Sequence, residues 1–148
     1  MDITISKAEI NNVASFAYLF DEYRVFYKQP SDIQGAINFL KERIEQNESV
    51  IFIAWLQDKA VGFTQLYPIF SSVSMKRTWL LNDLFVAETY RGNGIASRLL
   101  QFAQAFGEKT NSKWLLLQTA IDNFAAQKVY EKNGWKKDDA FYSYYFTF

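Results

Sequence analysis

The order of hydrophobic and polar residues along the first third of the chain predicts one strand and two helices. Residues 3 to 5 (ITI) predict a short opening strand. Apolar residues then recur at helical spacing over residues 10 to 20, which predicts a helix that runs to about residue 27. A second apolar stripe predicts another helix over residues 33 to 47. Two pairs of residues have the spacing of a capping box at these helix starts, Ser6 with Glu9 and Ser31 with Gln34.

The middle of the chain predicts an antiparallel meander of strands. Residues 50 to 56 (VIFIAWL) are apolar throughout, which is typical of a central strand that is covered on both faces. The polar step at residues 57 to 59 then turns the chain into a hairpin partner over residues 60 to 70. Residues 78 to 86 (TWLLNDLFV) are again β-like, and they extend the meander by one more strand.

Beyond residue 94 the pattern changes to a helical period. Residues 95 to 107 predict a helix, and residues 114 to 120 (WLLLQTA) predict a further buried strand. Since strand, helix and strand follow one another with short links, a right-handed parallel crossover is expected. A short helix should follow that is capped by Asp122 or Asn123 and runs through Tyr130.

The tail, residues 141 to 148 (FYSYYFTF), alternates and predicts a final strand. On such a strand one face would carry Tyr142, Tyr144, Phe146 and Phe148, which is more apolar surface than an exposed edge usually has. Two coverings fit this face: helices of the same chain, or a second copy in a homodimer.

No internal repeat, low-complexity tract or linker interrupts these patterns, and 148 residues is an ordinary length for one domain. Strands and helices are interleaved throughout. The sequence therefore predicts a single domain, residues 1 to 148, built on one mixed α/β sheet.

The amino-acid composition indicates which kinds of molecule the protein can bind. Hydrophobic residues make up 49% of the chain and aromatic residues 18%, so a packed core is expected. Lys plus Arg and Asp plus Glu both number 16, and no basic block suggests binding to nucleic acid. The opening residues lack the build of a signal peptide, and the apolar run at residues 50 to 56 is too short to cross a membrane. We therefore expect a cytoplasmic protein with no membrane partner.

The chain contains no Cys and no His. A thiolate nucleophile, a Ser/His/Asp triad, a disulfide and a Cys/His zinc site are therefore impossible, and no metal is expected. Any catalysis must depend on carboxylates, Tyr, Lys, hydroxyl groups or backbone dipoles.

The stretch YRGNGIASRLL, residues 90 to 100, places two glycines directly before a helix. Backbone N–H groups at a helix start attract anions, Gly92 and Gly94 let a phosphate approach, and Arg91 adds positive charge. An ordinary strand-to-helix loop that uses glycine for its geometry is the other interpretation. Ser97 stands where the dinucleotide fingerprint has its third glycine, and the lysine of a P-loop is missing, so neither motif fits.

Two segments, LLNDLFVAETYRGNGIASRLL and NFAAQKVYEKNGW, together resemble the GNAT family of N-acetyltransferases. Arg91, Gly94 and Ala96 match its signature, Gln/Arg-x-x-Gly-x-Gly/Ala, and small diamine and histone-type acetyltransferases are the most similar in appearance. The resemblance implies a mostly antiparallel sheet of about six to seven strands with about four helices. It also implies a β-bulge in the strand before the turn.

The resemblance further implies acetyl-CoA as co-substrate. The strand segment Leu84, Phe85 and Val86 would hold the pantetheine arm, with the main-chain groups of Leu84 and Val86 pairing to it like an added strand. The turn would hold the pyrophosphate through Arg91, Gly92, Asn93, Gly94, Ile95, Ala96 and Ser97.

Two residues near the C-terminus match functional positions of the family. Asn123 matches an Asn that contacts coenzyme A, and Tyr130 matches a Tyr that protonates the departing thiolate. Each also has a purely structural interpretation, Asn123 as a helix N-cap and Tyr130 as a core aromatic. Their spacing of seven residues is that of the family and favours the functional interpretation.

The general base is where the sequence departs from the family. The diamine branch carries an acidic pair on the strand before the turn, and this chain has Asn82 and Asp83 there. Asn82 cannot act as a base, so Asp83 is the candidate, and only a bulge would let both side chains face the same way. Asp83 as a buried structural carboxylate is the other possibility.

The acceptor should meet the segment from Phe20 to Asp32. Asp21 and Glu22 there would attract a cation, and Tyr23, Phe26 and Tyr27 would line its path, unless the segment is only an amphipathic helix. Asn82, Glu22, Tyr23 and Tyr27 are the substrate-binding candidates.

We therefore expect direct acetyl transfer from acetyl-CoA to a primary amine, in a small amine, a polyamine-like molecule or a lysine side chain. The acceptor is then a small molecule or a lysine-containing peptide. The alternatives are a non-catalytic acyl-CoA-binding module that has lost its base, and an interaction domain that binds no nucleotide.

Overall fold

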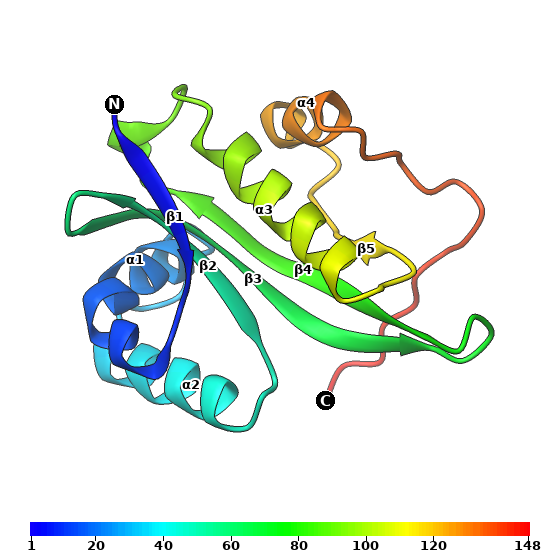
Figure 1. Cartoon of the computed structure of the whole chain (residues 1–148), viewed down its shortest axis with the longest axis horizontal. Coiled ribbons are helices and arrows are strands. Elements are labelled where there is room, and N and C mark those ends of the chain that lie inside the picture. Colours follow the sequence, from blue (N-terminus) through cyan, green and yellow to red (C-terminus); the bar gives the residue numbers. More distant parts are fainter. The chain divides into compact units, whose positions relative to one another are not determined.

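The computed structural model describes all residues from Met1 to Phe148 and is shown in Figure 1. The chain forms two compact units, Met1–Gln118 and Thr119–Phe148, and each is described by itself. The expectation of one domain stays a prediction.

The first unit is built on a five-stranded sheet in the order β1-β2-β3-β4-β5. The first four strands are antiparallel neighbours, and β5 pairs with β4 in parallel after the α3 crossover. The strands are β1 (Ile3–Lys7), β2 (Val50–Leu56), β3 (Lys59–Ser71), β4 (Lys76–Val86) and β5 (Leu115–Leu116).

Helices cover both faces of this sheet, as Figure 1 shows. Phe63 of β3 contacts the rings of Phe16 and Phe20, so one face lies under α1 and its neighbour α2. Gly62, the preceding residue, meets Ile95 and Leu99 of α3 on the opposite face. The helices of this unit are α1 (Val13–Phe26), α2 (Ile33–Glu45) and α3 (Ile95–Lys109), with 3-10 turns η1 (Ile10–Asn12) and η2 (Glu88–Tyr90).

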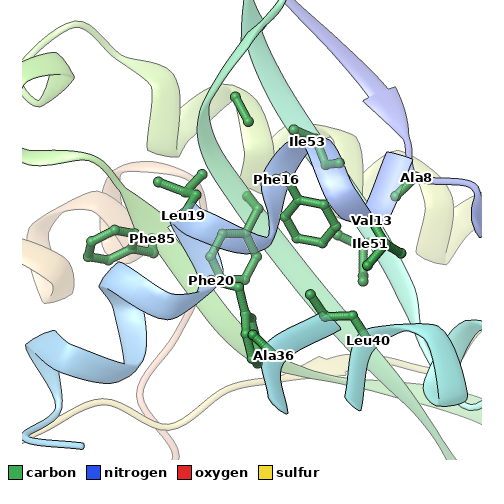
Figure 2. Close-up of a cluster of buried hydrophobic side chains, with 12 residues drawn as sticks. Ala8, Val13, Phe16, Leu19, Phe20, Ala36, Leu40, Ile51, Ile53 and Phe85 are labelled. Carbon is green, nitrogen blue, oxygen red and sulfur yellow. The ribbon is translucent and has the colours of Figure 1, made fainter. Parts of the chain in front are cut away.

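The core under α1 and α2 is drawn in Figure 2. Phe16, Leu19 and Leu40 are completely buried there, and Phe85 reaches the same cluster from β4. Burial of each such side chain stabilises the fold by about 1.5–3 kcal/mol. The β4 segment that precedes the glycine turn is thus fixed against α1.

Both predicted capping boxes are wrong. Ser6 lies within β1, and the reciprocal partner of Glu9 is Asn12, whose Oδ1 accepts from the Glu9 N–H at 2.8 Å. The α2 helix is capped by Asp32, whose carboxylate accepts from Gly35 N–H at 2.9 Å. The Ser31 hydroxyl donates to the Asp21 carboxylate instead, so it is not available as the cap of α2.

The predicted β-bulge in β4 is confirmed. Gln65 of β3 pairs with Asp83, but the next β3 residue, Leu66, pairs with Leu81. Asn82 is therefore the extra residue in the ladder. A bulge turns its neighbours relative to one another, so Asn82 and Asp83 lie on the same side of the strand, within hydrogen-bonding distance.

The second unit holds α4 (Phe124–Lys132). The helix ends before Gly134, and Gly134 has a left-handed conformation (φ 89°).

The four helices agree with the expectation, but the sheet has five strands rather than six or seven. The predicted strand at residues 141 to 148 is absent, and that at residues 114 to 120 is reduced to β5. Alternation alone makes no strand, because a strand also needs a partner for its N–H and C=O groups. The homodimer, argued from that strand, stays a prediction.

Candidate active site

One edge of β4 is open next to the glycine turn. The parallel partner β5 reaches only Trp79 and Leu80, so the edge from Leu81 to Val86 has no neighbouring strand in the sheet. The Ala87 N–H donates to Val61 on the β3 side at 2.9 Å. Since alternate residues of an antiparallel strand face the same neighbour, Val86 and Leu84 direct their main-chain groups to the open edge.

The turn after β4 keeps an open backbone. Gly92 and Gly94 have φ angles of 78° and 75°, in the left-handed region that other residues rarely adopt. A Cβ atom at either position would meet nothing within 4 Å, so both glycines border open space. The Asn93 side chain donates to the carbonyls of Tyr90 (3.0 Å) and Arg91 (3.2 Å), and it thereby holds the turn in shape.

The start of α3 has the chemistry of an anion site. Gly94 is the N-cap residue and has no side chain that could bond to the first N–H groups, which include those of Ile95 and Ala96. The helix dipole places positive potential at the same point. Arg91 is fixed beside it, because its Nε donates to the Val86 carbonyl at 2.8 Å and its guanidinium lies over the Phe85 ring at 5.4 Å. These groups fit a pyrophosphate.

Close packing seats this helix start on the sheet. A Cβ atom on Gly62 would lie 3.2 Å from Ile95 Cγ2 and 3.2 Å from the Phe85 carbonyl oxygen. Only glycine therefore lets the first turn of α3 lie this close to β3 and β4. The position of the turn depends on the contact between Gly62 and Ile95.

Asp83 lies at the centre of a hydrogen-bond cluster on the α1 face of the sheet. The residue is 5% exposed, and its carboxylate forms no salt bridge. The Tyr23 hydroxyl donates to Oδ1 at 2.8 Å, as does Asn82 Nδ2 at 3.0 Å. Gln65 Nε2 donates to Oδ2 at 2.7 Å. Both carboxylate oxygens are thus held by uncharged donors.

Burial sets the protonation of this cluster. It raises the pKa of the Asp83 carboxyl, and hydrogen bonds from Gln65, Tyr23 and Asn82 oppose that rise. Burial also raises the pKa of the Tyr23 and Tyr67 phenols, and the Asp83 charge adds to the effect. Both phenols are therefore neutral, and Asp83 takes up a proton at higher pH than an ordinary aspartate does.

The candidate residues of α1 have different surroundings. Tyr23 is in the Asp83 cluster, and Tyr27 packs edge-on against Tyr23 with ring centres 5.1 Å apart. Glu22 is exposed, and its charge acts on the Tyr18 phenol. Asp21 was expected to attract a cation, but it is buried and accepts from Ser31 Oγ (2.6 Å) and Asp32 N–H (2.7 Å). It is a structural carboxylate that joins α1 to α2.

Gln65 was missed by sequence reasoning. It is completely buried in β3, and no motif marks it. The polar pair Thr64 and Gln65 within the mostly apolar run of residues 60 to 70 was the available signal, because a buried amide needs a polar partner.

The second unit contains the two remaining candidates. The side chain of Asn123 caps α4 by accepting from Ala126 N–H at 3.2 Å, as its structural interpretation predicted. The Tyr130 ring lies 6.3 Å from that of Trp135, centre to centre. The family roles of both residues stay predictions.

Neither a metal cluster nor a membrane span is found. No group of three or more carboxylate side chains is placed to hold an ion, and no helix is long and apolar enough to cross a bilayer.

Sequence comparison identifies relatives along nearly the whole chain. The profile of the Acetyltransferase (GNAT) family matches residues 16–135. A Bacillus subtilis protein named uncharacterized N-acetyltransferase YhfO is 48% identical over 142 residues, which are 96% of this chain and 95% of that protein. A probable acetyltransferase of Haemophilus influenzae is 34% identical over 131 residues, or 88% of each chain.

Solved structures agree with the sequence comparison. The crystal structure of a probable acetyltransferase, 39% identical, matches with a TM-score of 0.94 and covers 98% of this chain and 97% of that chain. A predicted acetyltransferase from Clostridium acetobutylicum, solved with acetyl-CoA, shares the fold with a TM-score of 0.78 at 16% identity, over 97% of this chain and 96% of that chain. Together with the bulged strand, its open edge and the glycine turn, these matches show that the chain belongs to the GNAT acetyltransferase family and is an N-acetyltransferase.

Proposed function

We propose that the chain transfers the acetyl group of acetyl-CoA directly to a primary amine, with Asp83 as the group that accepts the amine's proton. One observation carries the proposal: a buried carboxylate without a cationic partner lies on β4 directly before the open edge at Leu84 and Val86. An amine arrives as an ammonium ion near neutral pH. A carboxylate at this position would both attract that ion and take its proton.

Each part of β4 and the turn has a role in this proposal. The main-chain groups of Leu84 and Val86 hold the pantetheine arm along the open edge, in the manner of an added strand, and the Val86 carbonyl also accepts from Arg91 Nε. Phe85 lies between them and packs against α1 through the Tyr23 ring. The turn from Arg91 to Ser97 holds the pyrophosphate with its backbone N–H groups and the Arg91 charge.

The proton balance of the reaction needs two groups of the chain. An ammonium ion and a thioester give an amide, a thiol and one proton that is released to water. Asp83 takes the first proton from the ammonium ion. Tyr130 donates a proton to the departing sulfur and recovers one from the amine nitrogen, a role that rests on the family resemblance.

The choice of acceptor draws on solved structures that share this fold. Structures of an aminoglycoside acetyltransferase, one of them with sisomicin, share this fold with TM-scores of 0.85 to 0.86 at 19% to 20% identity. The same fold therefore serves an aminoglycoside acetyltransferase in that protein. We propose a small amine, a polyamine-like molecule or a lysine side chain as the acceptor.

An acceptor screen tests the reaction. Purified protein and acetyl-CoA are incubated with polyamines, amino acids, aminoglycosides and lysine peptides, and the release of free thiol is followed. Saturable release with at least one amine is expected. Tight binding of acetyl-CoA without transfer to any acceptor would instead indicate an acyl-CoA-binding module.

A glycine substitution tests the pyrophosphate turn. Gly94→Ala forces a Cβ atom into the left-handed region, at a cost of about 1–2 kcal/mol, and is expected to weaken coenzyme A binding in calorimetric titration. Asn111→Ala is the control, because Asn111 is left-handed (φ 53°) beyond the other end of α3. Equal weakening by both variants would contradict the assignment of the turn.

A further inference from the structure

Asp83 is held by groups from three different elements. Tyr23 comes from α1, Gln65 from β3 and Asn82 from β4, and their hydrogen bonds are 2.7 to 3.0 Å long. None of the three is charged. A carboxylate that needed only neutralisation would be paired with Lys or Arg, so this arrangement favours a group that changes its protonation state.

Gln65 carries a second unusual feature. Its side chain is completely buried, and its Oε1 atom has no hydrogen-bond partner while Nε2 bonds to Asp83. An unsatisfied buried acceptor costs about 1–3 kcal/mol and is uncommon in folded proteins. The residue therefore retains an acceptor that the deprotonated form of Asp83 does not use.

Two of the three partners can reverse their hydrogen bonds. A Tyr hydroxyl donates to a carboxylate, and after rotation it accepts from a carboxylic acid. A Gln amide does the same when a half-turn about its terminal torsion exchanges Nε2 and Oε1. Tyr23 at Oδ1 and Gln65 at Oδ2 thus provide each carboxylate oxygen with one reversible partner.

We propose that Tyr23 and Gln65 are positioning residues that hold Asp83 in both of its protonation states: the partner of the carboxylate oxygen that takes the amine's proton reverses its hydrogen bond, and the other partner continues to donate. The inference rests on the proposed function, since it requires a proton on Asp83 during turnover. One proton moves from the ammonium nitrogen to a carboxylate oxygen, which leaves a neutral amine and a neutral carboxylic acid. No electrons are exchanged, and the proton returns to water before the next cycle.

The charges around the cluster are consistent with this role. The titratable groups that face Asp83 are the phenols of Tyr23, from α1, and Tyr67, from β3. Arg43 of α2 acts on Tyr67 and is itself paired with Glu42 and Glu48. No cation therefore fixes Asp83 in its charged form: burial raises its pKa, and the neutral hydrogen bonds oppose that rise. Among these, the Gln65 bond lowers the pKa most, followed by those of Tyr23 and Asn82.

The test compares variants of the cluster with matched controls. Gln65→Leu and Tyr23→Phe each remove one bond to the Asp83 carboxylate. Thr64→Val is the β3 control, because the Thr64 hydroxyl donates to the Asp83 backbone carbonyl (2.9 Å) rather than to its carboxylate. Tyr18→Phe is the α1 control, because the Tyr18 hydroxyl bonds to the Ala60 carbonyl.

Two measurements are made on each variant of the full chain. The ¹³C carboxyl signal of Asp83, assigned by comparison with Asp83→Asn, is titrated to obtain its pKa. The pH profile of kcat/KM is then recorded with the best acceptor. We expect both cluster variants to raise the Asp83 pKa, Gln65→Leu more than Tyr23→Phe, and to move the acid limb of the profile to higher pH. Both controls should leave the Asp83 pKa and the acid limb of the kcat/KM profile unchanged.

The two levels of the proposal fail separately. If both cluster variants keep the wild-type Asp83 pKa and the wild-type kcat/KM, the positioning role of Tyr23 and Gln65 is overturned. A raised pKa without any movement of the activity profile would leave that role standing and remove Asp83 as the base. If Gln65→Leu does not fold, the side-chain amide signals of Gln65 in the wild-type protein take its place. These must shift with the same midpoint as the Asp83 carboxyl, and their failure to do so would overturn the reversal.

Discussion

The amide nitrogen of Asn82 lies 3.0 Å from Oδ1 of Asp83, although neighbouring residues of a regular strand point to opposite faces. The bulge in β4 brings the two side chains together. As an uncharged donor, Asn82 stabilises the Asp83 carboxylate. A second carboxylate in place of Asn82 would instead destabilise the charged form of Asp83.

Asn82→Asp tests that relationship. Two carboxylates about 3 Å apart cannot both ionise easily, so the substitution should raise the pKa at which the pair loses its last proton. Activity that requires the deprotonated pair should be lost at higher pH than in the wild type. The acid limb of the kcat/KM profile measures this. Asn82→Ala is the control, since it only removes a donor and should shift the acid limb less than Asn82→Asp does. Equal profiles for Asn82→Asp and the wild type would show that the side chains at positions 82 and 83 do not titrate as a pair.

Asp83→Asn should separate activity from stability. Because burial raises the pKa of Asp83, its contribution to stability is present at pH values below the ordinary pKa of 3.8 and is lost as the pH rises through the raised value. At pH 7 the buried charge therefore opposes folding. The variant should unfold with a free energy equal to or up to about 2 kcal/mol above that of the wild type, measured by urea denaturation.

The same variant should lose about 10²–10⁴-fold in kcat/KM, because it lacks a general base. Retained activity with an unchanged pH profile would identify Asp83 as a purely structural carboxylate. A large loss of stability at pH 7 would contradict the sign of the pKa argument.

Asp21→Asn should behave in the opposite way. The hydrogen bond from Ser31 is the main cause of the lowered pKa of Asp21, and the Asp32 N–H adds to it. The stability that this carboxylate provides is thus present above its ordinary pKa of 3.8 and disappears as the pH falls through the lowered value. At pH 7 the variant should lose about 2 kcal/mol of unfolding free energy. This loss should shrink as the pH approaches 3, and a loss independent of pH would contradict the charge-assisted bonds.

Local features of the sequence predicted much of the fold and part of the site. Gly92 and Gly94 predicted the turn, because a left-handed backbone before a helix depends on only a few neighbouring residues. Apolar periodicity predicted α1, α2 and α3 for the same reason. The β-bulge followed from the resemblance to the family, since its extra residue, Asn82, has no local mark.

Contacts between distant residues could not be predicted. Gln65 meets Asp83 across two strands whose register depends on the bulge, so its role appears only once the strands are aligned. Asp21 sits among the polar residues of α1, and it is buried because the chain returns after the turn with Ser31 and Asp32. Residues 141 to 148 alternate as strands do, but the pattern carries no information on a partner.

Gly62→Ala should weaken coenzyme A binding without touching the turn itself. The added Cβ atom would lie 3.2 Å from Ile95 Cγ2 and from the rigid carbonyl of Phe85, so the start of α3 must move away from the sheet. Such overpacking costs about 1–3 kcal/mol, and it displaces the N–H groups that the pyrophosphate needs. Calorimetric titration should show a higher Kd than in the wild type. Gly107→Ala is the matched control at the other end of α3, because the atoms nearest to its Cβ belong to the flexible side chain of Leu115. The Kd of this variant should be unchanged. If both variants bind coenzyme A as the wild type does, the seating of α3 on Gly62 does not control the site.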